Sequence, residues 1–138
     1  MSLAQNKALA QLWFEEVWNQ GKESTINKLF HPQGKVYGFP QADSVLIGPE
    51  GFKTVHRQFN NTFSNIHINL DELIAEDDRV AMRWTCTGVH TGDGLGFPAS
   101  GRKATLLGSS FIVCRDGQII DAWNFMDLTK LALDLQSK

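Results

Sequence analysis

The hydrophobic pattern of this chain changes its period near Ile66. Before that point apolar residues recur at the three- and four-residue spacing of helix faces, and from there to about residue 127 they mostly alternate with the period of two that strands show. Helices followed by antiparallel hairpins predict an α+β domain, with helices covering one face of a curved sheet. The 138 residues fit a single domain over 1–138, long enough to enclose a core and a cavity.

Three helices are expected before the change of period. Ser2 and Gln5 match a capping box, and the apolar stripe after them predicts a helix over 3–19 that ends at Gly21. A short helix is expected at about 24–31, where Pro32 stops it, and a third from Gly48 to near Ser64. A brief strand is expected at 36–39.

The second part of the chain reads as strands and one last helix. Strands are expected from residue 66, from residue 80, at about 102–115 and at 119–127, with Asp116-Gly117 as a hairpin turn. A final amphipathic helix carries Leu128, Leu131 and Leu135. We expect the glycine-rich segment 92–101 to be a flexible connection, because no helix N-terminus follows it to bind a phosphate.

Charge and motif spacing exclude several classes of function. Thirteen basic against 15 acidic residues leave a net charge of −2, and no basic cluster exceeds Arg102-Lys103, which argues against a nucleic-acid partner or an anionic membrane. Since no leader peptide and no long apolar run are visible, we expect a soluble cytoplasmic protein. The four histidines lack the close spacing of metal ligands, so no metal is expected. Cys86 and Cys114 are expected to be free thiols about 23 Å apart along the sheet.

Four tryptophans and nine phenylalanines are the strongest hint of function. Many of them lie on faces that should converge between the helices and the sheet, where they either form ordinary core or wall an internal apolar pocket for a flat ligand. The residues that we expect to contact such a ligand are Phe14, Trp18, Tyr37, His56, Phe59, Trp84, Phe111, Trp123 and Phe125.

Asp127 is the most suggestive polar residue. Strict alternation in the last strand would put Ile119, Asp121, Trp123, Phe125 and Asp127 on one face, so that a carboxylate ends a row of large aromatic rings. Burial there would raise the pKa of the carboxyl and suit it to acid/base catalysis. A second role fits equally well, because Asp is also a favoured N-cap for the final helix.

Other polar residues could assist. His90 shares a strand face with Met82 and Trp84, where it could help catalysis or anchor the following loop. His56 lies on the apolar side of the third helix, as a ligand contact or as a hydrogen-bonded core histidine. The hydroxyl of Tyr37 could donate to a carbonyl oxygen or face water.

The second face of the sheet also carries apolar residues. Ala81, Val89, Ile112 and Ile120 are expected on it. An exposed apolar face of this kind often pairs with a second subunit, so we expect a homodimer.

Five motifs together resemble the SnoaL-like polyketide cyclase family, within the nuclear transport factor two and ketosteroid isomerase superfamily. They are WFEEVWNQG at 13–21, GPEGF at 48–52, DRVAMRW at 78–84, GVHTG at 88–92 and DGQIIDAW at 116–123, and the resemblance covers about 8–135. It implies an α+β cone around a deep apolar pocket and cofactor-free chemistry that closes a polyketide ring by an intramolecular aldol step. It also implies a pocket aspartate near the end of the last strand, best matched by Asp127, with Asp121 as the alternative.

The chain departs from its relatives at two places. Many of them carry a histidine and an aspartate before the proline that follows the first strand, where this chain has Tyr37-Gly38-Phe39-Pro40. The first helix also lacks the tyrosine of the ketosteroid isomerases, which disfavours that mechanism. The resemblance thus implies acid/base chemistry on an apolar, polyketide-like carbonyl compound, by Asp127 with His90. The alternative is a non-catalytic ligand-binding or dimerisation module on the same scaffold.

Overall fold

The computed structural model describes residues 2–39, 41, 43–93 and 98–136. In these residues a six-stranded curved sheet packs with four α-helices and one π-helix. The helices are α1 (Leu3–Trp13), the π-helix η1 (Phe14–Asn19), α2 (Glu23–Leu29), α3 (Gly48–Thr62) and α4 (Leu128–Gln136). The strands are β1 (Phe30–Tyr37), β2 (Val45–Ile47), β3 (Phe63–Glu76), β4 (Arg79–His90), β5 (Lys103–Arg115) and β6 (Gln118–Met126).

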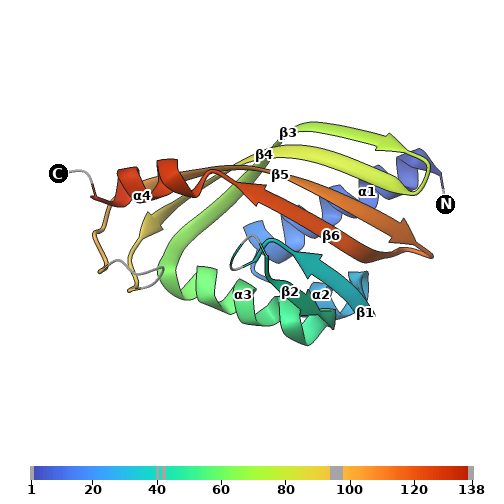
Figure 1. Cartoon of the computed structure of the whole chain (residues 1–138), viewed down its shortest axis with the longest axis horizontal. Helices are drawn as coiled ribbons and strands as arrows, with labels where there is room; N and C mark the ends of the chain where they lie inside the picture. The colour runs from blue at the N-terminus through green and yellow to red at the C-terminus, as the bar shows by residue number, and fades with distance from the viewer. Residues whose placement is uncertain (1, 40, 42, 94–97, 137–138) are drawn as a thin grey trace.

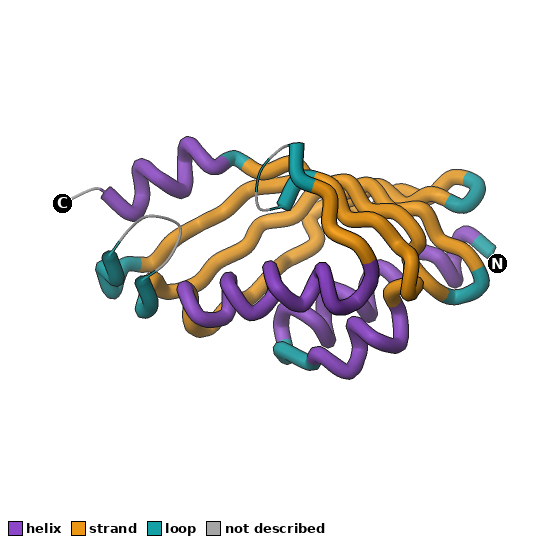
Figure 2. The backbone as a smooth tube through the Cα atoms, turned by 60° about the horizontal axis from the view of Figure 1, so that its bottom comes forward, coloured by secondary structure: helices purple, strands orange, loops and turns teal. Residues whose placement is uncertain are grey.

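The strands lie in the order β2-β1-β6-β5-β4-β3. All neighbours are antiparallel except β1 and β6, which run parallel. Helices α1, α2 and α3 lie along one side of the curved sheet, and α4 extends from one end of it (Figures 1 and 2). The α+β cone expected from the sequence is therefore confirmed.

The N-terminal helix begins as predicted and ends differently. The Ser2 hydroxyl accepts from the backbone N–H of Gln5 at 3.1 Å, and the Gln5 side chain accepts from the Ser2 N–H at 2.8 Å, which confirms the capping box. The α-helical turns stop at Trp13, and the expected residues 14–19 form η1. There the Asn19 side chain bonds both the N–H and the C=O of Ile68, which ties the helix end to β3.

The other boundaries differ by a few residues. Helix α2 ends at Leu29, and β1 starts at Phe30, so Pro32 lies inside the strand and does not stop the helix. Strand β3 begins at Phe63, directly after α3. The middle of the expected glycine-rich connection, 94–97, lies outside the described residues. Within the described part of the chain, no helix combines the length and the apolar character needed to cross a bilayer.

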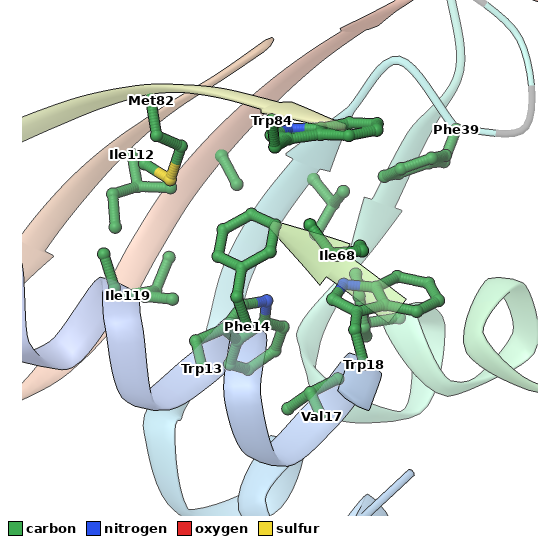
Figure 3. Close-up of a cluster of buried hydrophobic side chains, with 14 of the residues drawn as sticks. Trp13, Phe14, Val17, Trp18, Phe39, Ile68, Met82, Trp84, Ile112 and Ile119 are labelled. Atoms are coloured by element: carbon green, nitrogen blue, oxygen red, sulfur yellow. The ribbon is translucent and has the colours of Figure 1, made fainter. Parts of the chain in front are cut away.

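Strand β4 follows the predicted alternation over its whole length. Val80, Met82, Trp84 and His90 are buried on the inner face of the sheet. Phe14 and Trp18 project from η1 toward the strands that carry Trp84 and Ile68, and these side chains form the centre of the core (Figure 3). Cys86 pairs with Leu106, close to the expected register, and both cysteines are free thiols.

Strand β6 does not keep strict alternation. Val113 of β5 pairs with Asp121, but the next residue, Cys114, pairs with Ile119, so β6 holds one extra residue at this point. Such a bulge exchanges the faces of all residues beyond it. Ile119 lies on the inner face as expected, whereas Asp121, Trp123 and Phe125 lie on the outer face, and that part of the prediction was wrong.

The inner positions beyond the bulge belong to Ala122, Asn124 and Met126, all of which contact the cavity described below. Ile112, which we expected on the outer face, is also inner and only 5% exposed. It pairs with Ala122 across β5 and β6.

Candidate functional site

A cavity of about 60 Å³ lies between the helices and the inner face of the sheet. Among the described residues, its wall contains nine aromatic side chains from α1, η1, α3, the sheet and the segment after β1, together with aliphatic and small residues. Its lining residues are Ala10, Trp13, Phe14, Trp18, Phe30, Val36, Phe39, Phe52, Phe59, Phe63, Ile66, Ile68, Trp84, Cys86, Thr87, Gly88, Ala104, Leu106, Ser110, Ile112, Ile119, Ala122, Asn124, Met126 and Leu131. Four of the predicted contact residues, Phe14, Trp18, Phe59 and Trp84, are among them.

The other aromatic residues predicted for the pocket lie elsewhere. Tyr37 stacks on Trp123 with 5.2 Å between ring centroids, and Phe111 meets Phe125 edge to face. Phe111 and Phe125 are 48% and 58% exposed. All four belong to the outer face of the sheet. The bulge in β6 turns Trp123 and Phe125 outward, and Tyr37 and Phe111 pair with Trp123 from the neighbouring strands. Their assignment to the cavity was wrong.

Asp127 lies at the start of α4 and is exposed. Its Oδ1 accepts a hydrogen bond from the backbone N–H of Lys130 at 3.0 Å, which is the geometry of an N-cap. Neither Asp127 nor Asp121 is among the described residues that line the cavity. The expectation of a carboxylate facing the cavity from this strand end is therefore corrected, and the capping alternative describes the structure.

His90 is fully buried where β4 ends. Its Nδ1 lies 2.9 Å from the Ser100 hydroxyl, its backbone N–H donates to Arg102, and its C=O accepts from Gly101. These bonds hold both ends of the segment between β4 and β5 together. Its Nε2 is buried with no hydrogen-bond partner, and its ring lies 5.6 Å from Phe63, which contacts the cavity.

His56 is buried between the helices and does not line the cavity. Its Nε2 lies 2.6 Å from the carbonyl oxygen of Val17, in the middle of η1, and its ring packs against Trp18 and Phe52. The Nδ1 atom is buried without a partner. Because Nε2 supplies the donor for a helix carbonyl, His56 fits the alternative of a hydrogen-bonded core histidine.

Two polar side chains of the cavity wall, Ser110 and Asn124, were missed by sequence analysis. Trp84 Nε1–H donates to the Ser110 hydroxyl at 3.0 Å, and that hydroxyl lies 2.7 Å from Asn124 Oδ1. Asn124 Nδ2 donates to the backbone oxygen of Tyr37 at 3.2 Å. The sequence carried a signal for Ser110, which shares the inner face of β5 with Leu106 and Ile112. It carried none for Asn124, whose orientation depends on the bulge.

The cavity holds little charge. Among the described lining residues, Cys86 is the only titratable side chain, and burial raises its pKa to about 11. The thiol is thus neutral near pH 7. Within the same described ranges, no group of three or more His, Cys, Asp or Glu side chains is placed to hold a metal ion.

The cone-shaped sheet, the helices on its concave side and the apolar cavity between them define a protein of the nuclear transport factor two-like fold. A model of the SnoaL-like polyketide cyclase family matches residues 8–135. The chain belongs to this family.

Solved structures agree with this fold. TsrD from Streptomyces laurentii shares 27% identity with a TM-score of 0.86, covering 100% of this chain and 99% of its own. AclR from Streptomyces galilaeus, proposed to be a hydroxylase, shares 25% with a TM-score of 0.85 over 97% of this chain and 82% of its own. IdmH from Streptomyces antibioticus, proposed to be a polyketide cyclase, shares 21% with a TM-score of 0.84 over 96% and 99%. No curated protein sequence matches.

Proposed function

We propose that the protein binds a small, flat, apolar carbonyl compound of the polyketide type inside the cone. The observation that carries this proposal is an aromatic cavity whose wall includes a hydrogen-bonded polar pair, Ser110 and Asn124. Apolar walls with a few placed polar groups are typical of ligand sites. The family model supports the class of ligand.

The size of the cavity bears on how a ligand enters. Ligand-binding pockets usually measure ~300–1,000 Å³, whereas this cavity measures about 60 Å³. A compound of two fused rings therefore requires wall side chains to move. Among the aromatic wall residues of the helices, Phe59 is the most exposed to water. It is half-buried and packs edge to face on Trp18 and Phe39.

Binding can be tested with 1-tetralone, a two-ring ketone, by calorimetry. The wild type is expected to bind it saturably, and Ala104→Leu, which adds bulk to the cavity wall, to bind at least about tenfold more weakly. Thr105→Leu is the matched control, because it adds bulk on the next residue of β5, outside the cavity. Absence of saturable binding, or equal binding by Ala104→Leu, would contradict the proposal.

A second candidate function is cofactor-free ring closure by proton transfer, with His90 as the base. It is favoured by the family model and by His90 Nε2, a buried nitrogen without a partner. His90 is not among the described lining residues, but its ring packs against Phe63, which is. An imidazole nitrogen without a hydrogen-bond partner suits removal of a proton next to a ketone, while the apolar site limits competition from water.

Proton removal can be measured without knowing the natural substrate. In D₂O, the wild type is expected to speed exchange of the C2 protons of 1-tetralone, followed by NMR, and His90→Gln to lose the acceleration by ~10²-fold or more. Asp127→Asn is expected to retain it, because Asp127 is exposed and caps α4. Binding without any exchange would leave the ligand-binding function and remove the catalytic one.

We also propose a homodimer formed by the outer face of the sheet. Each strand has one outward-facing apolar residue that is paired with such a residue on the neighbouring strand. Together they form a continuous row of Ile74, Ala81, Phe111, Trp123, Tyr37 and Val45. Of these six residues, only Ala81 was predicted for this face from the sequence. Two free cysteines fit a reducing compartment such as the cytoplasm.

A further inference from the structure

The hydrogen-bond chain in the cavity has a fixed direction. An indole N–H only donates, so the Ser110 oxygen accepts from Trp84 and its single proton is free for Asn124 Oδ1. At the other end, the backbone oxygen of Tyr37 only accepts, so it faces the amide nitrogen of Asn124. The two ends therefore determine which side of the Asn124 amide is oxygen and which is nitrogen.

The hydrogen-bond chain begins at Trp84, and the position of this indole depends on a close approach between two strands. Gly108 pairs with Trp84, and a Cβ at Gly108 would lie 2.4 Å from the Trp84 ring. Only glycine lets the indole lie across β5 at this distance. That position brings Nε1 to Ser110, two residues further along the same strand.

Asn124 retains unused hydrogen-bonding capacity. One of its two amide protons is donated to Tyr37, and the second is not used in these contacts. Asn124 lines the cavity, where the surrounding wall is almost entirely apolar. An amide whose oxygen already accepts a bond is a better donor, because bonds in a chain polarise one another.

We propose that Asn124 donates its second amide proton to the ketone oxygen of the bound ligand, and so selects ketones over hydrocarbons of the same shape. This inference rests on the proposed ligand-binding function. Ser110, Trp84 and Gly108 act as positioning residues, because they set the orientation of the Asn124 amide and do not themselves carry the selectivity.

The Tyr37 carbonyl explains why an amide suits this position. A carboxylate at residue 124 would place an acceptor oxygen about where Nδ2 lies, 3.2 Å from another acceptor, the Tyr37 oxygen. Two acceptors facing each other in an apolar cavity are unfavourable. An aspartate here would therefore keep its proton to a higher pH than usual, since only the protonated form can donate.

The test uses 1-tetralone and tetralin, which share one ring skeleton and differ in the ketone oxygen. The wild type is expected to bind the ketone more tightly, and Asn124→Leu to reduce the ratio of the two affinities about tenfold, with little change for tetralin. Asn69→Leu is the control, because Asn69 is exposed on β3, away from the cavity, where its side chain donates to Asp71. Thermal melts without ligand show whether each variant folds.

A second variant separates recognition from folding. In Asn124→Asp, the single carboxyl proton is donated to the Tyr37 oxygen and none remains for the ketone, so the preference for the ketone is expected to be lost over the whole pH range in which the protein is folded. The wild-type preference should stay constant over the same range, since an amide does not titrate there.

The outcomes distinguish the two levels of the proposal. If neither compound binds, the proposed ligand-binding function fails and this inference fails with it. If both compounds bind and Asn124→Leu leaves their affinity ratio unchanged, the cavity binds ligands but Asn124 does not select the ketone. A folded Asn124→Asp protein that keeps the wild-type affinity ratio would likewise overturn the inference.

Discussion

The two faces of the sheet carry similar aromatic residues in different surroundings. On the inner face, Trp84 is 4% exposed, lies over Gly108 and donates its N–H to Ser110. On the outer face, Trp123 is half-buried and stacks on Tyr37 with an interplanar angle of 7°. The inner tryptophan is held by a specific polar partner and a close backbone approach. The outer one belongs to an open row of rings.

This difference separates two physical roles. A ring enclosed on all sides contributes to folding through burial and packing, and its removal leaves a cavity. A ring on an open row gains most of its burial only when another surface covers it. Substitutions on the inner face should therefore change stability and ligand binding, and those on the outer face should change association.

The largest effect is expected from the pair of tryptophan substitutions. Trp84→Ala should lower the free energy of unfolding by about 3–5 kcal/mol, whereas Trp123→Ala should cost less than half as much. Urea unfolding at low protein concentration measures both without a contribution from association. Equal losses would mean that the two faces are not energetically distinct.

The reactivity of cysteine thiols on the two faces of β4 offers a second comparison. Burial raises the pKa of Cys86 to about 11 from 9.0, so its thiolate fraction near pH 8 should be about a hundredfold below that of an unperturbed thiol. In a background with both native cysteines replaced by alanine, Thr85→Cys supplies the outer-face reference on the same strand. Labelling by a thiol-reactive reagent should be slow at Cys86 of the native sequence and fast at the cysteine introduced at residue 85.

The same pKa predicts how stability depends on pH. A raised thiol pKa means that the folded state keeps a proton that the unfolded state releases. Stability should therefore be unaffected below about pH 9 and should fall as the pH rises from 9 toward 11. Since the Cys114 pKa is raised in the same way, Cys86→Ala must be compared with Cys114→Ala. A flat profile from pH 9 to 11 would contradict the burial of both thiols.

Association tests the outer face directly. Phe111→Lys puts a charge in the middle of the apolar row, next to Trp123 in the register. We expect it to weaken a dimer by about 2 kcal/mol or more, as loss of a central aromatic contact does, and to leave 1-tetralone binding unchanged. Light scattering over a range of protein concentrations measures the molar mass of the wild type and of the variant. A wild type that remains one chain in mass at every concentration would refute the dimer.

The close approach on the inner face can be broken with a single methyl group. Gly108→Ala places a Cβ against the Trp84 ring and should cost about 2 kcal/mol of stability, because well-packed sites resist added volume. Ser109→Ala, on the opposite face of the same strand, should stay within about 0.5 kcal/mol. Thermal or urea unfolding compares them, and a stable Gly108→Ala protein would show that the indole can move.

Sequence reasoning worked where strands are regular. In β4, strict alternation held over 12 residues, so Trp84 and His90 were placed on the correct face. In β6, one extra residue near Ile120 exchanged the faces of Trp123, Asn124 and the residues after them. The bulge depends on pairing with β5, and no local sequence feature at Ile120 indicates it.

The bulge in β6 made the prediction of the candidate site less accurate than the prediction of the fold. Fold class follows from periods averaged over many residues, so a single bulge does not alter it. A site depends on the direction of individual side chains. The same bulge removed Asp121, Trp123 and Phe125 from the cavity and introduced Asn124, which strict alternation had placed outside. Ser110 was missed for a separate reason, because Phe111 was assigned to the pocket and Ile112 to the outer face, which places Ser110 outward as well.

The smallest effect is expected at Asp127, where the inner face ends and α4 begins. Asp127→Ala should cost about 1 kcal/mol through loss of the cap to Lys130, whereas Asp127→Asn, which retains a capping oxygen, should be close to neutral. Because Asp127 lies outside the cavity wall, neither variant should change 1-tetralone binding or proton exchange. If Asp127→Asn kept its stability but lost exchange, the carboxylate would have to reach the ligand in a conformation other than this one.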